Sequence, residues 1–106
     1  MAAEGSIVWE DEGDFFCVLS TYVKSDEAWV FELSEARPGP VGWASSGNAQ
    51  HLPGRTAVTV MVHDEEVEKP PFVFFDGDQE MPFEMLRRFT EFVAGAIAGP
   101  SEADQR

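Results

Sequence analysis

The sequence predicts an α+β fold: an antiparallel sheet of about five strands (a three-strand meander, a long loop and a hairpin) with one C-terminal amphipathic helix packed on one face. Three observations support this prediction. A chain of 106 residues has room for one domain only. The first apolar stretches, rich in aromatic and β-branched residues, are joined by segments too short for a parallel crossover. One stretch near the C-terminus instead repeats its apolar residues with the period of a helix.

The meander is predicted from three consecutive segments, Ser6–Glu10, Phe15–Val23 and Ala28–Leu33. Gly13 lies between the first two, where it can adopt the positive φ of a tight connection. The second segment is apolar on both alternate sets of residues near its start, which is typical of a central strand. In the third segment the large apolar residues alternate with Glu32, so one face is expected to be buried.

Residues 34–55 interrupt this pattern with seven glycines and prolines, and we expect an irregular loop there. Regular alternation returns at Thr56–Val62, and Phe72–Phe75 follows after two prolines. These two segments are expected to form the second hairpin.

The helix is predicted over Pro82–Ala98, with Pro82 as its first residue and Glu84 in the first turn, where the helix dipole favours a carboxylate. Gly99 and Pro100 are expected to end it. We therefore expect residues 1–100 to form a single α+β domain and residues 101–106 a disordered tail. The apolar stripe of this helix consists of Met85, Leu86, Phe89, Phe92, Val93, Ala96 and Ile97.

Composition excludes several classes of function. The chain has 20 acidic and 7 basic residues, a net charge of −13, so non-specific binding to nucleic acid is not expected. No apolar run is long enough to span a membrane. A single cysteine, Cys17, excludes internal disulfides and zinc sites with several cysteines, and we expect a cytoplasmic protein. Because 43% of the residues are hydrophobic, the chain should fold despite its charge.

No enzyme motif is present, so we predict no catalytic residue, no cofactor and no enzymatic activity. Cys17 lies in an apolar strand without a basic neighbour in sequence, which favours packing over nucleophilic chemistry. The segment Gly42–Gly47 contains two serines but lacks the spacing of a nucleophile elbow. His63 stands beside carboxylates, yet no second histidine lies at the spacing of a metal ligand.

The alternating carboxylates of Asp76–Glu80 raise the possibility of calcium binding. An EF-hand loop beginning at Asp76 would need glycine at its sixth position and glutamate at its twelfth, where Met81 and Arg87 stand. We therefore predict no metal site: the acids would form a turn and the start of the helix. A looser carboxylate site that includes Glu84 is the alternative.

The distribution of charge gives the functional hypothesis. No acid occurs from Ala36 to His63, and the acids gather at Glu10–Asp14, Asp64–Glu68 and Asp76–Glu84. Two of these groups are expected at hairpin tips, where their field would attract a basic protein partner. Trp43, in the neutral loop, is either an apolar anchor for that partner or packs against the sheet. The predicted partner-binding residues are Asp11, Glu12, Asp14, Trp43, Asp64, Glu65, Glu66 and Glu68.

The sequence thus favours a non-enzymatic acidic module that binds a basic, nucleic-acid-binding or nuclease-like protein, as an inhibitor or immunity-type protein. Small size, negative charge and an α+β fold are shared by many such proteins and by secretion chaperones, although fold alone does not imply function. One helix can cover only one face of the sheet, while large apolar residues occur on both. The alternative is therefore a structural or assembly protein that forms a homodimer through the uncovered face, its charge serving solubility only.

Overall fold

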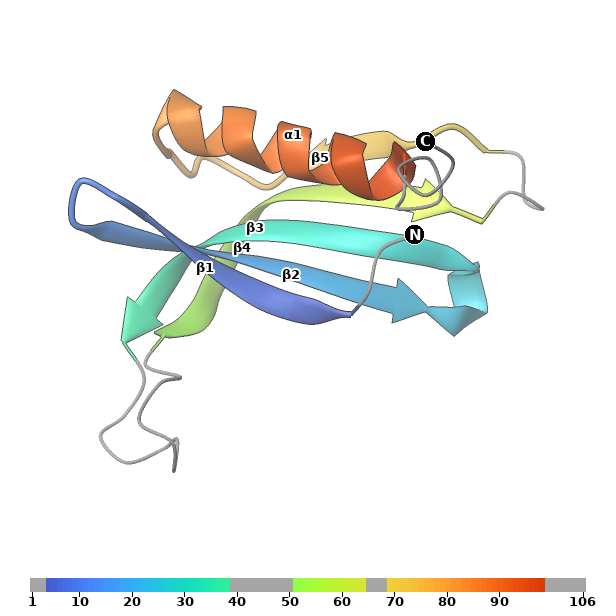
Figure 1. The fold of residues 1–106 in the computed structure, drawn as a ribbon, viewed down its shortest axis with the longest axis horizontal. Helices are drawn as coiled ribbons and strands as arrows, with labels where there is room; N and C mark the ends of the chain where they lie inside the picture. Colours follow the sequence, from blue (N-terminus) through green and yellow to red (C-terminus); the bar gives the residue numbers. More distant parts are fainter. Residues whose placement is uncertain (1–3, 39–50, 65–68, 99–106) are drawn as a thin grey trace, which may run out of the picture.

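The computed structural model describes residues 4–38, 51–64 and 69–98, and it confirms the predicted α+β class. Five strands form one antiparallel sheet in chain order, and one helix follows them (Figure 1). The elements are β1 (Gly5–Asp11), β2 (Asp14–Val23), the short 3-10 helix η1 (Lys24–Asp26), β3 (Ala28–Pro38), β4 (His51–His63), β5 (Phe72–Phe75) and α1 (Phe83–Ala98).

The first two turns both contain residues with left-handed backbone. Glu12 and Gly13 have φ angles of 50° and 91°, the pattern of a two-residue hairpin whose twist matches the flanking strands. At the next turn Glu27, with φ of 50°, closes η1 and donates its N–H to the carbonyl of Lys24 at 3.1 Å. Both turns hold neighbouring strands in the antiparallel register that the meander requires.

The prediction of an irregular loop over residues 34–55 is wrong at both ends. β3 continues to Pro38 and β4 already begins at His51, with Ala36 opposite Pro53. Register shifts between Leu33 and Ala36 let the paired strands continue past the prolines and glycines. Gly54 suits this position because a Cβ there would lie 2.6 Å from the backbone oxygen of Glu35. Residues 39–50 lie outside the described part of the chain.

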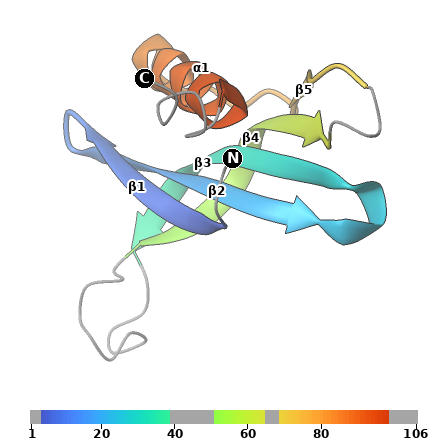
Figure 2. The same cartoon turned by 45° about the vertical axis from the view of Figure 1, so that its right-hand side comes forward.

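The core lies between α1 and one face of the sheet (Figure 2). Met85, Phe89 and Val93 of α1 are buried there, as the apolar stripe predicts. The helix begins one residue later than predicted: the carbonyl of Pro82 accepts the N–H of Met85 at 3.0 Å, so Pro82 precedes the first turn. The sheet contributes Phe16, Val18, Phe31, Leu33, Ala57, Val58 and Val60.

We call the other side of the sheet, which faces away from α1, the open face. The register places on it Val8, Phe15, Cys17, Leu19, Val30, Glu32, Met61, Phe72 and Phe74. The sheet is strongly twisted (Figure 2), and small residues between larger ones are buried even here, such as Cys17 at 2% exposure. Val8, Phe72 and Phe74 nevertheless remain exposed, and no described element packs over them.

Candidate functional site

The tip of the β1–β2 hairpin carries the first group of predicted partner-binding acids. Asp11 and Asp14 are directly opposite each other, and Glu12 occupies the turn between them. Glu12 and Asp14 are exposed, and Asp11 is half-buried. None of the three forms an ion pair with a described residue. Like charges placed directly across a strand pair repel, so this tip is a patch of negative charge that no described basic residue compensates.

Asp64, at the end of β4, has a different environment. Its half-buried carboxylate accepts a short hydrogen bond from the hydroxyl of Tyr22, and its N–H donates to the carbonyl of Glu27 at 2.8 Å. Asp64 therefore links β4 to the end of β2 as well as carrying charge. The other predicted members of the site, Trp43, Glu65, Glu66 and Glu68, lie outside the described residues.

The structure does not bring the β1–β2 tip and Asp64 together. The strands are antiparallel, so the turn at Glu12 lies at the end of the sheet where β4 begins, whereas Asp64 follows the opposite end of β4 (Figure 1). Asp26 and Glu27, in the turn between β2 and β3, lie at the same end of the sheet as Asp64. The acids thus form two separate patches at opposite ends of the sheet.

Acids around the start of α1 are partly neutralised. Asp76 pairs with Arg55 at 3.4 Å, and Arg87 binds both Glu84 and Glu91 along the exposed side of the helix. The hydrogen bond from Arg87, together with its charge, lowers the pKa of Glu84. In turn, the carboxylates of Glu84 and Glu91 raise the pKa of Arg87. Asp78 and Glu80 form no described ion pair. Within the described part of the chain, no three potential metal ligands are grouped closely enough to hold an ion.

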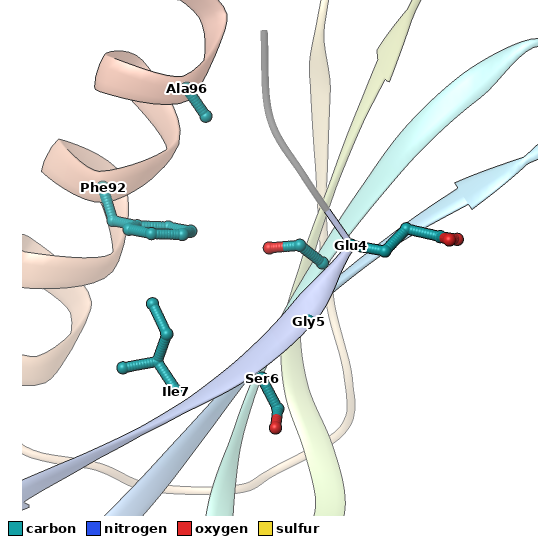
Figure 3. Close-up of a pocket in the computed structure, with 7 residues that line it drawn as sticks. Glu4, Gly5, Ser6, Ile7, Phe92 and Ala96 are labelled. Atoms are coloured by element: carbon teal, nitrogen blue, oxygen red, sulfur yellow. The ribbon is translucent and has the colours of Figure 1, made fainter.

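Two surface cavities flank α1 in the described part of the chain. The first, of about 350 Å³, lies between β1 and the later turns of α1 and is lined by Ile7, Phe92 and Ala96 (Figure 3). Glu4, at its rim, accepts the backbone N–H of Tyr22 at 3.0 Å. The second, of about 440 Å³, lies between β5 and the start of α1. Its lining includes Phe75, Asp76, Gln79, Met81 and Leu86.

Cys17 lies in β2 and His63 at the end of β4. Burial raises the pKa of the Cys17 thiol, which favours its protonated form. The ring of His63 stacks on Phe72 with centroids 5.8 Å apart, and its Nδ1 is buried without a hydrogen-bond partner among the described residues.

Sequence reasoning missed the residues that neutralise or hold the acids. Arg55 reaches Asp76 across 21 residues, and Tyr22 reaches Asp64 across 42. The guanidinium of Arg88 in α1 lies 4.4 Å from the ring centroid of Trp9 in β1, a contact between residues distant in sequence. Only the spacing of Arg87 from Glu84 and Glu91, three and four residues away, was a readable signal for an ion pair.

Comparisons of the chain with protein-family models, curated proteins and solved structures found no match. Among the helices that the structure describes, none is long and apolar enough to cross a membrane. A functional proposal therefore depends on the chain's own charges and exposed surfaces.

Proposed function

We propose that this protein is a non-enzymatic, cytoplasmic binding module that presents carboxylates to a basic protein partner. The observation that carries the proposal is the uncompensated patch at the β1–β2 tip, Asp11, Glu12 and Asp14. The partner would be a nucleic-acid-binding or nuclease-like protein, and this protein would act as its inhibitor or immunity-type antagonist by imitating phosphate spacing.

The geometry of the tip supports this role. The two-residue turn and the paired strands fix the backbone that carries these acids, so little backbone entropy is lost when a partner binds. Because no described basic residue pairs with these acids, binding a cationic surface would break no internal ion pair. With a net charge of −13, the whole molecule would also accelerate the approach of a basic partner.

The proposal is tested by neutralising the tip with Glu10→Gln, Asp11→Asn, Glu12→Gln and Asp14→Asn. The fold should stay intact or become more stable, because repulsion between exposed like charges is relieved. A partner captured from the native host at low salt and identified by mass spectrometry should associate more slowly with the variant. In the unmodified protein the association rate should fall as salt rises.

A matched control removes charge from the helix instead, with Glu84→Gln and Glu91→Gln, whose carboxylates are already bound by Arg87. This variant should change the association rate less per charge removed. If the neutralised tip leaves the rate unchanged, its charge serves solubility alone and the proposal fails. Asp64 is left out of the set because Asp64→Asn would also disturb its hydrogen bond with Tyr22.

The open face supports a second candidate, a structural or assembly protein that forms a homodimer through this face. Val8, Phe72 and Phe74 are 43%, 39% and 49% exposed, and the half-buried Leu19 and Met61 lie between them. Exposed apolar surface of this kind often marks a protein contact. Val8→Lys should dissociate such a dimer in sedimentation experiments, whereas neutralising the β1–β2 tip should strengthen it.

A further inference from the structure

The open face carries one of its acids in the middle of its apolar residues. Glu32 lies in β3, the central strand of the five, and its cross-strand neighbours are Leu19 of β2 and Thr59 of β4. Phe74 of β5 continues the same row of paired residues. Glu32 is half-buried and forms no ion pair with a described residue. A carboxylate is thus held on a mostly apolar surface without a described cation.

The strands around Glu32 have no cation to offer it. No lysine or arginine occurs in β1, β2 or β5, in residues 28–34 of β3 or in residues 56–63 of β4. A second copy of this chain, laid face to face on these segments, would therefore cover Glu32 without pairing it. An unpaired charge is strongly disfavoured once an apolar contact excludes water from it. The charge of Glu32 thus disfavours a second copy and favours a partner that brings a cation.

The open face is also broad enough for a helix to cover. On the other side of the sheet α1 packs in this way, and a sheet can be covered by helices on both of its faces (Figure 2). The apolar residues of the open face extend across the sheet from Val8 in β1 to Phe74 in β5, with the half-buried Leu19 and Met61 between them. An amphipathic helix would bury these residues as α1 buries those of the opposite face.

We propose that the open face binds an amphipathic helix of the basic protein partner, and that a lysine or arginine on the apolar side of this helix pairs with Glu32. This contact rests on the proposed function, because the helix would belong to the same partner. Glu10 connects the two surfaces: it lies opposite Phe15 on the open face and directly precedes Asp11 of the β1–β2 tip. The tip would attract the partner through its charge, and the open face would hold it through apolar contact and one ion pair.

Two synthetic helical peptides test the contact. The first is an amphipathic helix with a central lysine on its apolar side, and the second has norleucine there, which keeps the aliphatic chain but lacks the charge. The unmodified protein should bind the lysine peptide at least about tenfold more tightly at physiological salt, because a covered charge is costly without its partner. The methyl NMR signals of Leu19, Val30 and Met61 on the open face should shift on binding, whereas that of Met85 in the core should not.

Glu32→Gln should abolish the preference for the lysine peptide, since it removes the charge and keeps the size of the side chain. The losses caused by Glu32→Gln and by norleucine should not add when both are present. Asp78→Asn is the matched control, because Asp78 is also an acid without a described ion pair but lies in the turn between β5 and α1. This control should keep the preference. If Glu32→Gln fails to fold, as judged by circular dichroism, the two peptides still test the contact on the unmodified protein.

Neutralising the β1–β2 tip separates this contact from the proposed function. Asp11→Asn with Glu12→Gln and Asp14→Asn should slow the association of the captured partner but leave the preference between the two peptides unchanged. A slower association together with no effect of Glu32→Gln on the preference would overturn the helix contact and leave the proposed function standing. Equal binding of both peptides to the unmodified protein, or a chain that sediments as a dimer broken by Val8→Lys, would also overturn it.

Discussion

Replacing Phe89 with alanine tests whether α1 is docked as the structure shows. Phe89 is 0% exposed and lies at the centre of the apolar stripe, with buried Met85 and Val93 one turn away on either side. Burial of a phenylalanine side chain contributes about 1.5–3 kcal/mol through removal of apolar surface from water. Its truncation also leaves a cavity, because the surrounding side chains relax only in part.

Together these two effects place the loss for Phe89→Ala at about 3 to 5 kcal/mol in the free energy of unfolding. Small domains are stable by only about 5–15 kcal/mol, so the loss should be plain in urea unfolding followed by circular dichroism. The slope of the unfolding free energy with urea should not change, since the fold stays the same.

Phe83→Ala is the matched control, because Phe83 starts the same helix but is 75% exposed. An exposed substitution of this kind should change the free energy of unfolding by no more than about 0.5 kcal/mol. A loss below about 1 kcal/mol for Phe89→Ala, or equal losses for both variants, would mean that α1 does not pack on the sheet through this stripe.

Three further predictions concern single groups. Calorimetry with millimolar calcium should show no saturable heat, because two of the carboxylates around the start of α1 are already bound by arginines. A micromolar Kd for calcium would refute this prediction, since calcium binding would then stabilise the fold by about 4 kcal/mol at millimolar metal. Cys17 should react with a thiol reagent only once the protein is unfolded, and rapid reaction of the native protein would show that the thiol is accessible. Because Arg87 lowers the pKa of Glu84, their ion pair stabilises the fold fully at pH values above the ordinary carboxyl pKa near 4.5. This stabilisation is lost as the pH falls through the lowered pKa of Glu84. Glu84→Gln should therefore reduce stability at neutral pH but not in strong acid, and a pH-independent difference would contradict that reasoning.

Much of the fold could be predicted because its signals are local. The turn at Glu12 and Gly13, the alternation around Glu32 and the stripe centred on Phe89 each depend on residues a few positions apart. Such patterns specify strands, turns and a helix before any long-range contact forms. They were sufficient to predict a meander, a hairpin and one helix.

The segment from residue 34 to residue 55 shows where local signals fail. Its prolines and glycines predict a loop, yet Pro53 and Gly54 are part of β4. Pairing with β3 across the register shifts outweighs the local preference, and the close approach of Gly54 to Glu35 depends on a neighbour distant in sequence. β-strand formation depends on such cross-strand partners more than helix formation does.

The sequence by itself determined that this protein is acidic and where along the chain its acids lie, because charge is a sum over residues. Only the tertiary structure decided which acids are uncompensated and which share a surface. Asp64 is bound by Tyr22 and Asp76 by Arg55, whereas the acids of the β1–β2 tip have no described partner and lie at the other end of the sheet from Asp64. The physical reason is that ion pairs and hydrogen bonds act over a few ångströms, and the register of the folded strands, rather than distance along the chain, sets those separations.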